Sequence, residues 1–174
     1  MSPPEVNVRI GELAVSDSDG GVLVSIGLGS CIGLVLLDGA RGIGGLAHIM
    51  LPVSSSTGAA TPGKFADLAV PALIERLERL GASRRQLEAV LVGGARMFSF
   101  AASATLDVGA RNIANTQQAL STAGIPVRAS ATGGSVRRTV RVLVDEGAVL
   151  LREVGAETRE LHRARARPRR AVSA

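Results

Sequence analysis

The sequence predicts an α+β domain in which strands outnumber helices. Short aliphatic runs separated by glycine-containing turns recur along the chain, as expected for β-strands, and only two segments have the longer periodicity of amphipathic helices. The chain has 174 residues, enough for one domain with a sizeable core. Because only 2% of its residues are aromatic, that core has to be built from valine, leucine, isoleucine and alanine. The order of elements, strands with two inserted helices, predicts a layered α+β architecture.

The elements are predicted in order along the chain. Residues 5–16 predict a strand or a hairpin through Gly11, and a small polar loop at 53–63, a candidate substrate lid, precedes the first helix. Strands are predicted at 22–26, 32–37, 43–51, 86–92, 125–131, 136–144 and 148–154. Helices are predicted at 64–80 and 109–123, ending at Gly81 and Gly124. Pro71 must lie near the first turn of its helix or kink it.

The stretch 25–52 organises the rest of the chain. It holds the only cysteine, Cys31, and one of the two histidines, His48, on two aliphatic strands joined by a turn around Gly39. In a hairpin whose loop has two or four residues, the numbers of two directly paired residues add up to an odd number. The numbers 31 and 48 also add up to an odd number, so such a loop places the thiol and the imidazole on one face, opposite or diagonal to each other. A three-residue loop would send them to opposite faces. A catalytic role therefore predicts an even-length loop or a compensating bulge.

A cysteine beside a histidine can carry out nucleophilic acyl transfer. The imidazole takes the thiol proton and later returns it to the leaving amine. The hydroxyl of Ser25 is a candidate to accept a hydrogen bond from the ring, and backbone N–H groups around Gly29, Ser30 and Cys31 can form an oxyanion hole. The alternative is that Cys31 is a small buried hydrophobic residue. One cysteine and one histidine fall short of the usual zinc ligand sets, so we expect no metal.

The charge is concentrated at the C-terminal end. Residues 157–174 carry six arginines and two glutamates, which account for most of the net charge of +5. We therefore expect a single domain over 1–156 and a basic, disordered tail over 157–174, in which His162 has no assigned role. Such a tail can contact anionic lipid, nucleic acid or an acidic protein surface, but a solvated tail is the more common case, and we expect no nucleic-acid partner. With a single cysteine, no membrane-length apolar run and no secretory signal, the sequence predicts a cytoplasmic protein.

Several motifs resemble one known family. The stretches GLGSCIGLVLLD, GIGGLAHIMLP, KFADLA, VGGARMF and GARNI are similar to those of the chemoreceptor glutamine deamidase family CheD, over roughly residues 8–152. The resemblance implies hydrolysis of selected glutamine side chains on bacterial methyl-accepting chemoreceptors to glutamate, without a cofactor. It places the nucleophile on Cys31, the histidine on His48 and the third residue, usually threonine, on Ser25. It also implies a β-sandwich flanked by helices, similar to other cysteine deamidases and toxins.

The resemblance leaves a second function open. It implies a further partner, a CheC-type phosphatase of the chemotaxis response regulator. Ser25 replaces the family threonine, and the loop 131–137 departs from the family pattern of an acidic residue followed by Asn-Ser-Gly-Arg. The alternative function is accordingly a docking module, without catalysis or weakly catalytic, that regulates such a phosphatase. A sluggish Cys31 thiol would favour the module, and a trapped thioester would favour the enzyme.

Overall fold

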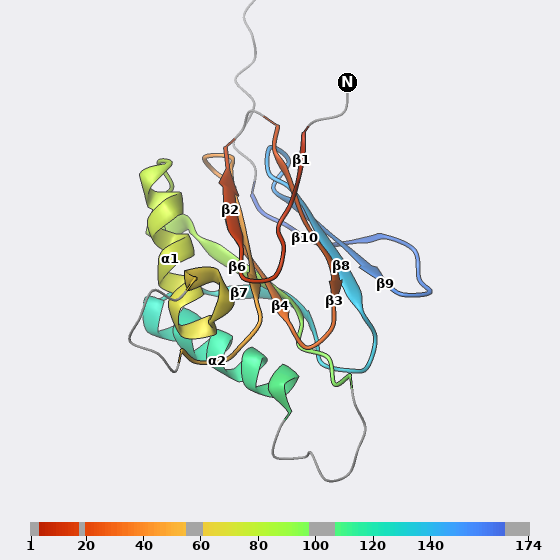
Figure 1. Cartoon of the computed structure of the whole chain (residues 1–174). Coiled ribbons are helices and arrows are strands. Elements are labelled where there is room, and N and C mark those ends of the chain that lie inside the picture. Colours follow the sequence, from red (N-terminus) through yellow and green to blue (C-terminus); the bar gives the residue numbers. More distant parts are fainter. Residues whose placement is uncertain (1–3, 18–19, 55–60, 98–106, 166–174) are drawn as a thin grey trace, which may run out of the picture.

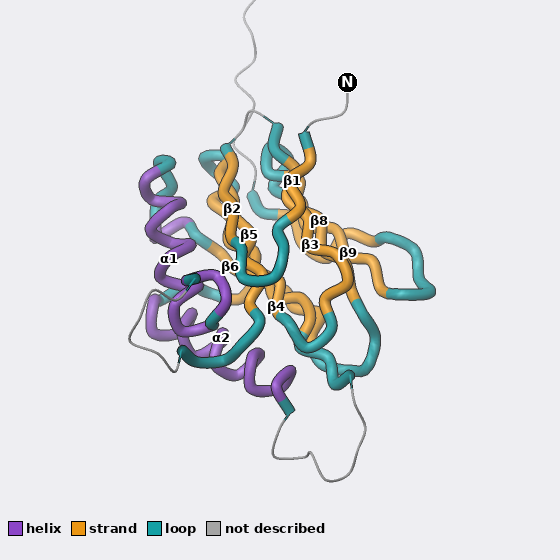
Figure 2. Tube along the Cα trace, viewed as in Figure 1, coloured by secondary structure: helices purple, strands orange, loops and turns teal. Residues whose placement is uncertain are grey.

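The computed structural model describes residues 4–17, 20–54, 61–97 and 107–165. In this part of the chain, ten strands form two five-stranded sheets that pack face to face. Two α-helices lie against the outer face of one sheet, as Figures 1 and 2 show. The predicted layered α+β sandwich is confirmed, with both helices on the same side. No helix in the described ranges is long and apolar enough to cross a membrane.

Each sheet draws its strands from distant parts of the chain. The first sheet has the order β1 (Glu5–Asn7), β3 (Val22–Leu28), β8 (Arg138–Leu143), β9 (Ala148–Glu153) and β10 (Arg159–Arg163). The second has the order β2 (Leu13–Ser16), β5 (Ile43–Ile49), β4 (Ile32–Asp38), β6 (Glu88–Gly93) and β7 (Val127–Thr132). Two short 3₁₀ helices, Pro62–Lys64 and Arg84–Gln86, occur in connections.

The central strand β4 separates two hydrophobic cores. Leu34 and Leu36 face the helices, whereas Val35 and Leu37 face the first sheet. All seven residues of β4 are buried, and this explains why residues 32–37 form a continuous apolar run rather than an alternating pattern. The strand therefore forms the rigid centre from which the segment carrying Cys31 extends.

The helices cover the second sheet through regularly spaced small and aliphatic residues. Helix α1 (Ala66–Arg79) buries residues three and four positions apart, and Pro71 lies in its second turn with the ring exposed, later than predicted. Helix α2 (Val108–Ala123) begins at Asp107, whose carboxylate accepts a hydrogen bond from the Ala110 N–H. Gly124 ends it in the left-handed conformation, as the sequence predicts. The first turn of α2 thus lies at a fixed place beside the end of β6.

The predicted N-terminal hairpin is wrong. β1 pairs parallel with β3 in the first sheet, whereas β2 pairs antiparallel with β5 in the second. Residues 8–12 cross from one sheet to the other, and Gly11 takes a positive φ of 81° in this crossing. The alternating pattern indicated strands correctly but does not reveal which sheet each strand joins.

The predicted disordered tail is also wrong for its first part. Arg159–Arg163 forms β10, which pairs antiparallel with β9, and Ala164 is buried beside it. His162 contacts Glu88 at 2.7 Å, and Arg163 forms an ion pair with Glu160 at 2.6 Å. Charged side chains are usual on an edge strand, so the arginine-rich pattern concealed a strand rather than excluding one. Residues 166–174, and the centre of the predicted lid at 55–60, lie outside the described residues.

Candidate active site

The β4–β5 hairpin places Cys31 and His48 on one face. Asp38 pairs with Ile43 and Gly33 pairs with His48, so the loop has four residues and paired numbers sum to an odd value, as predicted. Cys31 therefore lies diagonal to His48, a position about 7–8 Å away across an antiparallel pair, on the face that looks toward the first sheet. The residue opposite His48 is Gly33, which has no side chain of its own, and the side chains of Leu28 and Val140 pack over it.

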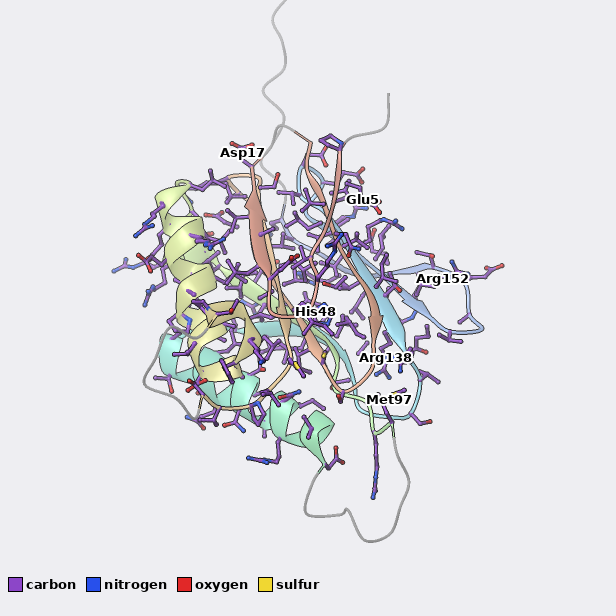
Figure 3. The ribbon with its side chains drawn as sticks, viewed as in Figure 1. Glu5, Asp17, His48, Met97, Arg138 and Arg152 are labelled. Carbon is purple, nitrogen blue, oxygen red and sulfur yellow. The ribbon has the colours of Figure 1, made fainter. Side chains whose placement is uncertain are left out.

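Both side chains line one cleft of about 680 Å³. His48 is 6% exposed, and Figure 3 shows it near the centre of the molecule, with Met97 toward the lower end of the view. The wall of the cleft combines apolar side chains with three arginines, Arg9, Arg96 and Arg137, and one carboxylate, Asp107. Apolar lining comes from Val8, Ile10, Ile26, Met50, Leu51 and Met97, among others. The cleft is therefore large enough for a side chain delivered by another protein.

The backbone of the crossing segment fixes the tautomer of His48. The ring Nδ1 lies 3.1 Å from the carbonyl oxygen of Val8. A carbonyl oxygen can only accept a hydrogen bond, so Nδ1 carries the proton in the neutral ring, and Nε2 is left with a free lone pair. The backbone N–H of His48 donates to the carbonyl of Glu12, and its carbonyl accepts from the N–H of Gly11. The segment 8–12 thus holds the histidine at three points.

Ser25 reaches the histidine indirectly. Its hydroxyl is fully buried and donates to the same Val8 carbonyl, at 2.8 Å. The expected hydrogen bond from the imidazole to Ser25 is absent, although both residues lie in the described part of the chain. Ser25 and His48 share one acceptor instead, so the hydroxyl acts on the peptide that orients the ring.

Burial favours the neutral form of both side chains. It raises the pKa of the Cys31 thiol, an effect that the nearby Arg137 guanidinium opposes. Burial lowers the pKa of His48, while its hydrogen bond to Val8 and the charge of Glu12 act in the opposite direction. Among the described residues, the Cys31 thiol makes no hydrogen bond to the ring or to any other group. Burial thus disfavours both charged forms, the thiolate of Cys31 and the imidazolium of His48.

The segment before Cys31 has paired carbonyls and unpaired amides. The carbonyl oxygens of Gly29 and Cys31 accept hydrogen bonds from Ala95 and Gly94, both at 2.8 Å, and that of Ser30 accepts from the Asn112 side chain at 2.9 Å. Among the described residues, no acceptor is found for the N–H groups of Ser30 and Cys31. Two unpaired N–H groups beside a candidate nucleophile are what an oxyanion hole requires.

Glycine at position 93 is needed for this arrangement. Gly93 has a positive φ of 112°, and a Cβ on it would overlap the carbonyl oxygen of Cys31. The close approach lets the residues after β6 bind the Cys31 segment. Gly93 and Gly94 belong to the VGGARMF motif, but nothing in a glycine pair indicates which backbone lies against it.

The structure adds three residues to those that the sequence identified. Val8 holds His48 through its carbonyl, Asn112 holds the Ser30 carbonyl, and Arg137 places a positive charge near the thiol. Asn112 belongs to the GARNI motif, and this motif is the signal that the sequence offers for it. Val8 gave no such signal, because any residue has a backbone carbonyl and the sequence does not show which of them accepts a hydrogen bond. No group of three or more His, Cys, Asp or Glu side chains suited to a metal ion occurs in the described ranges.

A cysteine and a histidine with a free ring nitrogen in one cleft of a β-sandwich is the arrangement of a thiol-dependent hydrolase. A family model described as CheD chemotactic sensory transduction matches residues 50–153. Proteins from Clostridium novyi (strain NT) and Clostridium kluyveri are each 42% identical over 163 residues, which covers 92% of this chain and 100% of the relative. Both are named "Probable chemoreceptor glutamine deamidase CheD". The chain belongs to the CheD family, and the resemblance in the sequence is confirmed.

Proposed function

We propose that this protein hydrolyses the side-chain amide of glutamine residues on bacterial chemoreceptors and releases ammonia and glutamate. The relatives' names supply the substrate class, and the cleft supplies the chemistry. The observation that carries the mechanism is the Nδ1–Val8 hydrogen bond at 3.1 Å, because it leaves Nε2 of His48 as a base in the cleft that also holds Cys31. The reaction takes place in the cytoplasm, where a free thiol stays reduced.

The first half of the reaction forms a thioester. The sulfur of Cys31 attacks the carboxamide carbon while its proton passes to Nε2 of His48. The carbonyl oxygen becomes an oxyanion, which the N–H groups of Ser30 and Cys31 bind. When the C–N bond breaks, the imidazolium gives its proton to the departing nitrogen, and ammonia leaves.

The second half consumes one water. Nε2 of His48 takes a proton from the water, whose oxygen attacks the thioester carbon. The C–S bond then breaks, the sulfur regains its proton from the imidazolium, and the glutamate product leaves. The enzyme returns to its thiol and neutral imidazole, so the cycle converts one amide and one water into one carboxylic acid and one ammonia.

Ammonia release from a cytoplasmic chemoreceptor fragment tests this proposal. We expect release by the wild-type protein, with a matching glutamine-to-glutamate mass change in the fragment, and none by Cys31→Ala or His48→Ala. Arg85→Ala is the control, because this arginine is exposed and lies outside the residues that line the cleft. Full activity in Cys31→Ala would remove the thiol from the mechanism.

A CheC-type phosphatase remains a proposed second partner, and the alternative of a docking module predicts a different result in the same experiment. If docking alone were the function, the wild-type protein would release no ammonia, and Cys31→Ala would alter phosphatase activity as the wild type does. Arg138 is 7% exposed and holds the 133–134 loop by donating to the Gly133 carbonyl at 2.7 Å. The surrounding loop 131–137 departs from the family pattern, although Gly133, Gly134 and Arg138 match it, and this loop is where we expect any difference in docking.

A further inference from the structure

Asn112 is a buried polar residue whose amide joins the segment just before β4 to the segment just after β5. It lies on α2 with no exposed surface, and its Nδ2 donates to the carbonyls of Ser30 at 2.9 Å and Met50 at 3.0 Å. Ser30 directly precedes Cys31. Met50 follows His48 by two residues, and continuing the β4–β5 register places it opposite Cys31. One side chain therefore sets the spacing between the nucleophile's segment and the base's segment.

This bond also sets the direction of the Cys31 N–H. A trans peptide is planar, with its C=O and N–H groups pointing opposite ways. Because the Ser30 carbonyl points to Asn112, the Cys31 N–H points away from that bond, and it has no acceptor among the described residues. The neighbouring carbonyls of Gly29 and Cys31 are held by Ala95 and Gly94. Asn112 supplies the only one of these three restraints that comes from a side chain.

The burial of Asn112 has a cost that packing alone does not explain. Its Oδ1 atom is buried and has no hydrogen-bond partner in the described part of the chain. Burying an acceptor without a donor lowers stability, so an apolar residue would serve a purely structural helix face better. The fold keeps an amide here because two N–H donors on one planar group can hold two carbonyls at once.

We propose that Asn112 is a positioning residue that keeps the Ser30–Cys31 peptide oriented for oxyanion binding. The inference rests on the proposed deamidase function. It concerns stabilisation of the charge that develops on the substrate oxygen, and not the reactivity of the thiol. Losing the restraint thus slows reactions that pass through an oxyanion and leaves simple alkylation of Cys31 unchanged.

The test compares Asn112→Asp and Asn112→Ser with Thr116→Val. The aspartate keeps the shape of the side chain but cannot donate when ionised. Thr116 is the matched control, because it lies one turn further along α2 and has a buried hydroxyl without a partner in the described residues. We expect the Asn112 variants to lose about 10- to 100-fold in kcat with KM little changed. This is less than the roughly 100- to 1000-fold cost of removing one oxyanion donor, because the Cys31 N–H is misplaced rather than removed. Thr116→Val should keep the wild-type kcat.

A second pair of probes separates positioning from folding. A peptide aldehyde adds to the Cys31 thiol to give a hemithioacetal whose oxygen occupies the oxyanion hole, whereas iodoacetamide alkylates the thiol without using it. In the Asn112 variants, aldehyde affinity should fall in parallel with kcat while the alkylation rate stays within twofold. An equal fall in both, or a folded variant with unchanged kcat and aldehyde affinity, would overturn the proposal.

Neither a folding failure nor a failure of the deamidase function leaves the outcome ambiguous. If both Asn112 variants fail to fold, the amide proton of Cys31 in the wild-type protein is followed by NMR as the peptide aldehyde binds. A downfield shift supports the free, positioned N–H, and no shift overturns it. An inactive wild-type protein would refute the proposed function, while an active wild type with unaffected Asn112 variants would refute only this inference.

Discussion

Replacing Ser25 by alanine distinguishes an indirect role from a direct one. In the structure the Ser25 hydroxyl donates to the Val8 carbonyl, which also accepts from His48 Nδ1. Ser25→Ala removes this donor and leaves the carbonyl with its bond to the ring, so no polar atom is orphaned. The loss is that of one neutral hydrogen bond, about 0.5–1.5 kcal/mol of stability. For a domain of this size, Tm should fall by roughly 2–4 °C per kcal/mol.

The effect on catalysis follows from the same geometry. The ring keeps its own acceptor, and only the support of that acceptor is weakened. If the weaker orientation of the ring raises the activation free energy by up to about 1.4 kcal/mol, kcat falls by at most tenfold. If Ser25 itself held the ring, as the aspartate of a serine-protease triad does, the loss would approach about 10⁴-fold.

Ammonia release under saturating substrate is the assay, with a thermal melt to show that each variant is folded. Ser25→Thr is the matched control, because it restores the hydroxyl and adds a methyl that restricts its rotamers. We expect Ser25→Thr to recover the activity that Ser25→Ala loses. A folded Ser25→Ala whose kcat falls by a hundredfold or more would refute the indirect role of Ser25.

Three further predictions follow from the charges in the cleft. Because burial raises the pKa of Cys31, its alkylation rate should still be rising above pH 9.0, and a plateau below that pH would contradict this. Because the charge of Arg137 lowers that pKa, Arg137→Ala should slow alkylation several-fold at a fixed pH, with Arg96→Ala as the unaffected control. Because burial lowers the pKa of His48 in the folded protein, the unfolded chain binds a proton at this histidine at a higher pH than the folded chain does. The free energy of unfolding should therefore fall as the pH drops below 6.5. Denaturation curves of His48→Gln should show a smaller fall than those of the wild type.

The placement of Cys31 and His48 on one face could be predicted because it depends only on the number of residues in the loop between their strands. Side chains alternate along a strand, so an even loop length is enough to bring positions 31 and 48 to one face. The continuous aliphatic run of β4 and the glycine stops of α1 and α2 were likewise local signals. These features need no knowledge of what packs against them.

The remaining parts of the site depend on contacts between distant segments. Val8 acts through its carbonyl, which every residue has, so no pattern distinguishes it. Asn112 is polar and sits in a helix, where sequence periodicity assigns polar residues to solvent; its burial follows from the close packing of α2 on the residues after β6. β10 was missed because its charged side chains outweighed the strand signal of its few apolar residues.

The two pKa directions change how thiol reactivity should be interpreted. Moving a proton from Cys31 to His48 creates two charges, and burial opposes both. The cost falls once the sulfur has attacked, because the negative charge then lies on the substrate oxygen, beside the unpaired N–H groups. Because burial disfavours the thiolate before the substrate binds, a slow reaction with a simple electrophile at neutral pH is expected of the enzyme as well as of a docking module. Thioester trapping and ammonia release separate the two functions, whereas the resting reactivity of Cys31 does not.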